Sequence, residues 1–150
     1  MSKKPSVYEQ IIQKYPRVFT GGNTIELHNV GWVDIIDDVC SIINDELEHM
    51  PEELAQGIYA SQIKTKFGGL RFYMSHSTPI IEGAIRMAEM ISLRACEVCG
   101  NKGFPITIGS WTSTFCTKHR HQEEERVAAE RIKWAKEELA RQVEDSEDPK

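Results

Sequence analysis

The 150-residue chain has no long apolar run. No stretch approaches the roughly 18 residues that a membrane-spanning helix needs, and the N-terminal Met-Ser-Lys-Lys-Pro is not followed by the apolar segment of a signal peptide. We therefore predict a cytoplasmic protein with no membrane partner. Its length and its 40% content of hydrophobic residues suit one globular domain with a proper core, and leave room for a small appended module.

The motifs of common enzyme classes are also missing. The sequence contains no Walker A run, no dinucleotide fingerprint, no G-x-S-x-G elbow and no H-E-x-x-H pattern. No group of acid, base and nucleophile stands out. We therefore predict no catalytic residues and do not expect an enzyme.

Two consecutive segments each lack charge of one sign, the first positive and the second negative. Residues 23–53 contain no lysine or arginine but nine acids, namely Glu26, Asp34, Asp37, Asp38, Asp45, Glu46, Glu48, Glu52 and Glu53. Residues 54–75 contain no acid but three bases, Lys64, Lys66 and Arg71. This segregation indicates either two elements that neutralise each other across the fold or an external acidic ligand such as a phosphate backbone.

The basic segment predicts a β-hairpin, because QIKTKFGGLRFYMS (62–75) places two glycines between two alternating runs. With Gly68 and Gly69 as the turn, Phe67 would pair with Leu70 and Lys66 with Arg71. One face would then be apolar, formed by Ile63, Thr65, Phe67, Leu70, Phe72 and Met74. The other face would carry the candidate ligand-binding residues, which are Lys64, Lys66, Arg71 and Tyr73.

Cysteine is scarce, but three of the four cysteines fall in one pattern. CEVCG supplies Cys96 and Cys99, and CTKH supplies Cys116 and His119, with sixteen residues between the pairs. Two short turns that each present two soft ligands fit a tetrahedral zinc site of the ribbon or knuckle type, with strands at 105–108 and 111–115 between them. Four ligands leave no open position, so we predict a structural zinc. His121 is the alternative fourth ligand, and buried thiols without a metal are the alternative interpretation of the pattern.

Two further residues near this pattern carry expectations of their own. Glu97 stands between two ligands and is expected to point outward, as residues inside a knuckle normally do. The fourth cysteine, Cys40, lies near the apolar face of an acidic helix, where core packing is its expected role.

Periodicity predicts the remaining elements. Apolar residues at helical spacing indicate helices over 2–15, 31–50, 78–95 and from about 119 or 122 onward, and TIELH (24–28) is a strand candidate. Together these elements predict an α+β fold, with helices packed on a small antiparallel sheet. The expected organisation is an α+β core over 1–95, a zinc module over 96–121, and a charged C-terminal helix and tail over 122–150.

The last helix has an unusual composition. Its apolar stripe is narrow, formed by Val127 or Ala128, Ile132, Ala135, Leu139 and Val143, and charge covers the rest. One interpretation is a solvated helix packed lightly on its own domain. The other is an interaction arm that contacts a partner through Ile132, Trp134 and Leu139, with a homodimer through this helix as one form of it.

Four motifs follow one another between about Gly31 and His119. They are Gly31, Trp32, Asp34, Ile36 and Asp37; then KFGGLRFY (66–73); then Ser92, Cys96, Cys99 and Gly100; and finally Trp111, Thr114, Cys116 and His119. In this order they resemble a widespread set of small, functionally unassigned proteins of bacteriophages and prophages. The resemblance implies a viral origin, a location in the host cytoplasm and a zinc-bearing α+β domain, and it implies no catalytic residues.

Three functions remain open at this stage. The first is an accessory protein that binds and modulates a host protein, such as a component of defence or transcription, through the acidic helix or the terminal arm. The alternative is a nucleic-acid or nucleotide binder that uses the basic hairpin face, although the net charge of −5 opposes a polyanion at long range. An enzyme with an unrecognised site ranks last.

Overall fold

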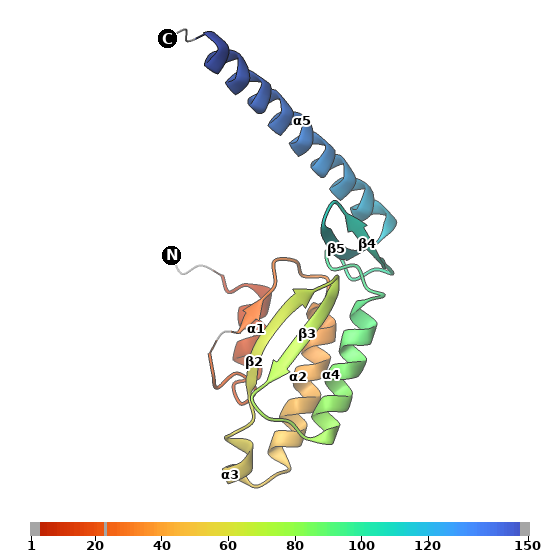
Figure 1. Ribbon diagram of the computed structural model, residues 1–150. Helices are drawn as coiled ribbons and strands as arrows, with labels where there is room; N and C mark the ends of the chain where they lie inside the picture. The colour runs from red at the N-terminus through yellow and green to blue at the C-terminus, as the bar shows by residue number, and fades with distance from the viewer. Residues whose placement is uncertain (1–3, 23, 148–150) are drawn as a thin grey trace. The chain divides into compact units, whose positions relative to one another are not determined.

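The computed structural model describes residues 4–22 and 24–147. The chain divides into two compact units, 1–116 and 117–150. The first unit holds α1 (Val7–Lys14), β1 (Ile25–Glu26), α2 (Val33–Glu48), α3 (Glu52–Ala55), β2 (Ala60–Lys66), β3 (Gly69–Met74), α4 (Pro79–Ser92), β4 (Phe104–Ile108) and β5 (Trp111–Phe115) (Figure 1). The second unit holds α5 (Thr117–Glu147). The predicted α+β class is confirmed. The predicted start of the first helix at Ser2 and the last three residues of the predicted C-terminal tail, 148–150, lie outside the described residues.

Local chemistry explains where the helices begin. Ser6 caps α1 in a reciprocal capping box with Glu9, so the helix begins at Val7, five residues later than its periodicity predicts. Thr78 accepts a hydrogen bond from the Ile81 N–H, and Pro79 occupies the first turn of α4, where its missing N–H costs nothing. No helix in the described part of the chain combines the length and hydropathy that a bilayer-spanning segment needs.

The main sheet has three strands in the order β1-β2-β3. β2 and β3 are antiparallel, as predicted, but β1 runs parallel to β2, with Ile25 opposite Ile63. The prediction of a wholly antiparallel sheet is therefore wrong for this strand. The physical reason is the connection: α2 and α3 carry the chain from β1 back to the same end of the sheet before β2 begins, which is how parallel neighbours are joined.

The hairpin turn lies one residue earlier than predicted. Its central residues are Phe67 (φ 51°) and Gly68 (φ 74°), and Lys66 pairs with Gly69. Gly69 belongs to the strand because it packs closely: a Cβ there would lie 3.0 Å from Cδ2 of Leu93. Leu70 now pairs with Thr65 and Arg71 with Lys64, two positions earlier on β2 than predicted. Because the slip is an even number of residues, the faces keep their other members. Phe67 leaves the apolar face for the turn and is exposed. The opposed like charges become Lys64 and Arg71.

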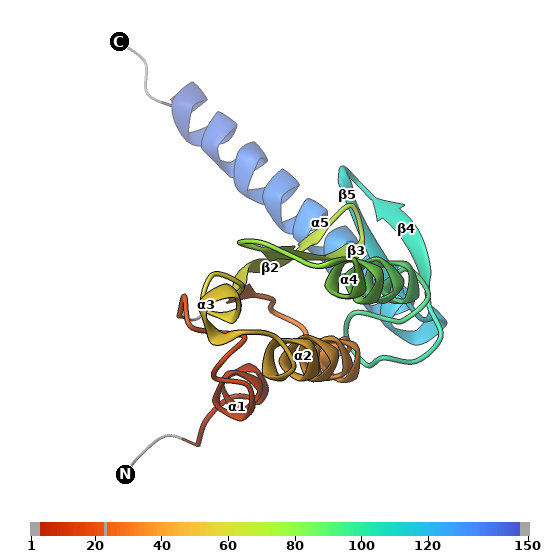
Figure 2. The ribbon, with the colours of Figure 1, turned by 90° about the horizontal axis from the view of Figure 1, so that it is seen from below.

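The core lies between the sheet and two helices that pack side by side, α2 and α4 (Figure 2). α1 packs on α2. The largest fully buried side chains of these elements are Ile36, Ile43, Leu47, Ile63, Leu70 and Ile81. Cys40 is buried among them, as predicted, and burial raises the pKa of its thiol.

α4 protects the outer edge of β3. Ser92 Oγ accepts the Leu70 N–H at 2.9 Å, and Glu89 accepts the Phe72 N–H at 3.2 Å. Two edge amides that another strand could otherwise pair with are thus satisfied within the chain. This role explains why Ser92 is fully buried, whereas its neighbour Ile91 is exposed.

The acidic helix does not neutralise the basic hairpin. Asp37 of α2 pairs with Lys14 at 2.9 Å, and Glu46 accepts a hydrogen bond from Thr78. Arg71 lies 3.8 Å from Glu89 of α4 instead. Among the described residues, no ion pair joins an acid of α2 to a base of the hairpin, so the acidic helix does not account for the charge segregation. Glu26 of β1, in the same acidic segment, does lie opposite Lys64 of β2.

Candidate functional site

The four predicted ligands come together. One ligand atom from each of Cys96, Cys99, Cys116 and His119 lies within 4.8 Å of the others, so the group is able to hold a metal ion. His119 lies in the first turn of α5 and is half-buried. The rival His121 is exposed, and its Nδ1 lies 3.8 Å from Glu124.

The geometry and chemistry of the donors fit a tetrahedral cation. Two thiolates bound to zinc at about 2.3 Å lie about 3.8 Å apart across a tetrahedral angle, and the sulfurs of Cys99 and Cys116 lie 3.9 Å apart. A disulfide would hold its sulfurs at about 2.05 Å, and none of the four cysteines forms one. Burial raises the pKa of the Cys96 thiol, and a bound divalent cation would displace that proton and neutralise the thiolate.

The CEVCG segment is folded into a compact turn by its own backbone. The Gly100 N–H donates to the Cys96 carbonyl at 2.8 Å, and the Cys96 N–H donates to the Asn101 carbonyl at 2.7 Å. Gly100 has φ 77°, a conformation that favours glycine, and this residue therefore permits the sharp turn between the ligands. The predicted hairpin follows, with Ile108 opposite Trp111, as expected from the turn at Gly109 and Ser110.

A loop distant in sequence packs tightly on this turn. The Gly31 N–H donates to the Glu97 carbonyl at 2.8 Å, and Nε1 of Trp32 donates to the Ala95 carbonyl at 2.8 Å. A Cβ at Gly31 would lie 2.1 Å from the Cys96 oxygen, which leaves no room for any side chain. The start of α2 and the first ligand are therefore held as one body.

Glu97 does not point outward, contrary to the prediction. Its side chain is buried, and its carboxylate accepts a hydrogen bond from Asn29 Nδ2 at 3.3 Å. Its N–H donates to the Thr114 carbonyl on β5. Glu97 thus links the ligand turn, the loop before α2 and the second hairpin.

The turn between β2 and β3 contacts β5, the strand that precedes the third candidate ligand. Thr114 is fully buried and donates its hydroxyl proton to the Gly68 carbonyl at 2.6 Å. A Cβ at Gly68 would lie 3.2 Å from Cγ2 of Thr112. The two sheets of the first unit meet at this point.

The predicted ligand-binding residues lie in the expected strands, but they are not equally available. Nζ of Lys64 lies 5.7 Å from the centre of the Tyr73 ring, and Nζ of Lys66 lies 5.5 Å from that of Phe67. Lysines at this distance are attracted by the ring face. Arg71 is more engaged, because it also donates to the Leu70 carbonyl at 2.8 Å.

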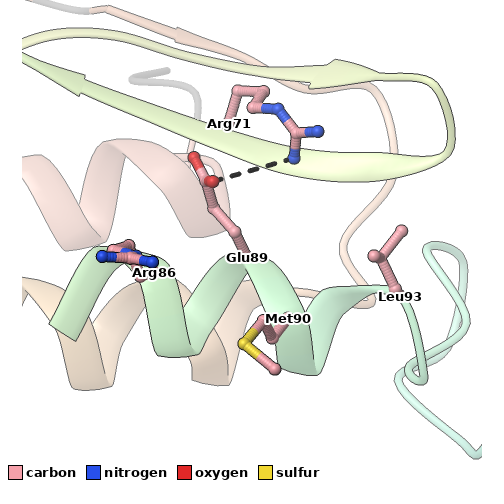
Figure 3. Close-up of a pocket in the computed structure, with 5 residues that line it drawn as sticks. All are labelled: Arg71, Arg86, Glu89, Met90 and Leu93. Atoms are coloured by element: carbon pink, nitrogen blue, oxygen red, sulfur yellow. Dashed lines mark ion pairs between the residues drawn. The ribbon is translucent and has the colours of Figure 1, made fainter. Parts of the chain in front are cut away.

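Arg71 lines a pocket of about 270 Å³ between β3 and α4 (Figure 3). Arg86 and Glu89 contribute charge, and Met90 and Leu93 contribute apolar surface. Figure 3 shows the guanidinium of Arg71 turned toward Glu89, while Arg86 and Met90 lie on the outer side of the helix. No sequence signal identified Arg86 or Glu89, because only the fold brings α4 beside β3.

The predicted partner-binding residues all lie on α5 and are exposed, with 58% of Ile132, 63% of Trp134 and 63% of Leu139 accessible. They do not share one face. A helix advances about 100° per residue, which places Ile132 and Leu139 about 20° apart and Trp134 on nearly the opposite side.

The fold and the site thus define an α+β protein with one four-ligand candidate metal centre in its described residues. Comparison of the chain with models of protein families, with curated proteins and with solved structures finds no match.

Proposed function

We propose that the protein is a small zinc-bearing accessory protein of viral origin that binds and modulates a protein of the host cell. Zinc would be held by Cys96, Cys99, Cys116 and His119 in a ribbon-like module, followed by the charged C-terminal helix. Four protein ligands complete a tetrahedral sphere, which is typical of a structural site. The binding function then belongs to surfaces that the metal holds in place.

The observation that carries the proposal is Phe67. A bulky residue at positive φ is a genuine outlier, and Phe67 has φ 51° in the hairpin turn. Its ring gains little from packing, because 74% of the residue is exposed. Asparagine or glycine would meet the same turn at lower cost. Because the backbone strain at Phe67 is not offset by packing of its ring, it supports a role for this residue in contact with another molecule.

A second aromatic residue lies close to the same point. Trp111 is 68% exposed and directly precedes Thr112, which contacts Gly68. Exposed tryptophan and phenylalanine are enriched at the centres of protein interfaces. The tip of the first hairpin and the start of β5 together offer a protein partner such anchors.

Replacing Phe67 with asparagine tests this proposal. We expect Phe67→Asn to raise the free energy of unfolding by about 1 kcal/mol, because asparagine tolerates the left-handed conformation better. The same variant should lose most of its capture of a host protein from nuclease-treated bacterial lysate. Ile80→Asn is the matched control, since Ile80 is also exposed but lies in a regular helix. Equal capture by Phe67→Asn and the unaltered protein would contradict the proposal.

The alternative is a nucleic-acid or nucleotide binder. It is favoured by the lysine and tyrosine pair of Lys64 and Tyr73, and by the pocket that Arg71 shares with Arg86. A basic face with an aromatic ring contacts phosphates and stacks on a base at once. Glu89 and the net charge of −5 weaken this case.

For this alternative, we expect a single-stranded oligonucleotide to bind more weakly as salt is raised, because phosphate contacts release counterions. Tyr73→Ala should weaken binding by about 1–3 kcal/mol through the lost stacking. Fluorescence anisotropy with a labelled oligonucleotide measures both effects. Binding that does not respond to salt rules out contacts to phosphate.

A further inference from the structure

One side of α5 carries an apolar stripe that is exposed along its length. At about 100° per residue, Ala128, Ile132, Ala135 and Leu139 fall within about 60° of one another. All four residues are exposed. The ion pairs of the helix, such as Arg126 with Glu123 and Lys133 with Glu137, run along its surface and leave this stripe apolar.

The stripe has the spacing and the sizes of a helix-pairing seam. Its residues recur at intervals of four, three and four, as at the a and d positions of a heptad. Large and small side chains alternate, with Ile132 and Leu139 as the large ones and Ala128 and Ala135 as the small ones. This alternation suits a partner whose small residues lie opposite the large ones.

We propose that α5 pairs with α5 of a second copy of this chain in antiparallel orientation. When Ile132 lies opposite Ala135 of the second copy, Leu139 lies opposite Ala128 of that copy in the same register. Every layer of the seam then combines one large and one small side chain. A parallel pair would instead place Ile132 against Ile132 and Ala135 against Ala135, which alternates overfilled and empty layers.

The charges beside the seam also select the antiparallel pair. Arg131 and Glu138 flank the same side of the stripe, and in the antiparallel register each faces the other residue on the second copy. Two opposite-charge contacts form by symmetry. Glu138 already lies 2.9 Å from Arg141 on its own helix, so Arg131 of the second copy joins an existing pair. The parallel register would bring Arg131 against Lys136, a like-charge contact.

Charge reversal separates these arrangements. In sedimentation equilibrium of the full chain, at protein concentrations up to about 1 mM, we expect a reversible dimer. Arg131→Glu and Glu138→Arg should each raise the dimer dissociation constant at least about tenfold, since each creates two like-charge contacts. The double variant should restore dimerisation. An equimolar mixture of the two single variants should form a heterodimer, because every contact is then between opposite charges.

Two controls carry the same kinds of change outside the seam. Lys133→Glu reverses a charge on another face, and Trp134→Ala removes a large exposed ring about 130° from the centre of the stripe. Neither should change the dissociation constant. Leu139→Asn should abolish the dimer, and circular dichroism checks that the helix persists.

Three results would overturn the proposal. A monomer throughout the concentration range would leave the stripe to a different partner. Strengthening by Arg131→Glu would show a parallel pair, because that change removes the like-charge contact with Lys136. A dimer that survives Leu139→Asn would place the interface elsewhere on the chain.

Discussion

Removal of the proposed zinc is expected to unfold residues 1–116 as a whole, and not only the segment that carries the candidate ligands. The ligand turn is bonded to the rest of this unit at separate points: Gly31 and Trp32 before α2 donate to it, and Thr114 joins the following hairpin to Gly68. Structural zinc contributes about 10–16 kcal/mol in small zinc domains at pH 7, and the whole stability of a domain is about 5–15 kcal/mol. The loss therefore matches or exceeds what holds the core together.

Trp32 reports on this unfolding from outside the ligand segment. It is 2% exposed, and a variant with Trp111→Phe and Trp134→Phe makes it the sole tryptophan. Addition of a chelator to this variant should shift its fluorescence to that of a solvated indole and abolish the cooperative thermal transition. Acid should act in the same way, because protons compete with the metal for the thiolates.

Ligand variants separate the effect of the metal from that of the chelator. His119→Ala should unfold the unit at neutral pH, whereas His121→Ala, two residues away and exposed, should leave its stability unchanged. A sharp melting transition of Trp32 that persists without metal would show that the core folds independently.

Gly31→Val is expected to destabilise the fold by about 3 kcal/mol or more, the upper range for forcing atoms into a packed site. The clash is with backbone, since a Cβ at this position would lie 2.1 Å from the Cys96 oxygen and 2.6 Å from the Glu97 oxygen. The loop before α2 must then separate from the ligand turn. Chemical denaturation with metal bound measures the loss.

Gly83→Ala is the matched control for this substitution. Gly83 lies inside α4, and a Cβ there meets nothing within 4 Å. Alanine should stabilise the helix by roughly 0.5–1 kcal/mol. Equal and small effects of the two substitutions would mean that the loop and the ligand turn are not packed together in solution.

Short-range patterns made much of the structure predictable. The spacing of Cys96, Cys99, Cys116 and His119 was sufficient because each pair lies within one turn of chain, and the hairpin between them needs only neighbouring residues. The apolar periodicity of α2 and α4 located both helices to within a few residues.

Features that depend on distant residues were not predictable. The turn of the first hairpin lies one residue earlier than predicted because Gly69 packs against Leu93, which is 24 positions further along the chain. Arg71 forms its ion pair with Glu89 of α4 and not with the acidic helix, because α4 lies beside β3. Nothing in the sequence around Gly31 indicates its close contact with Cys96. A single sequence shows residue types, whereas these contacts depend on how the elements pack.

X-ray absorption at the zinc edge, with metal analysis of protein purified without a chelator, tests the central claim most directly. We predict one zinc per chain, with three sulfur ligands at about 2.3 Å and one nitrogen ligand at about 2.0 Å. That result would define a closed site built by the three cysteines and His119. Protein without metal, or a zinc with an oxygen ligand from water in its fourth position, would contradict a structural role.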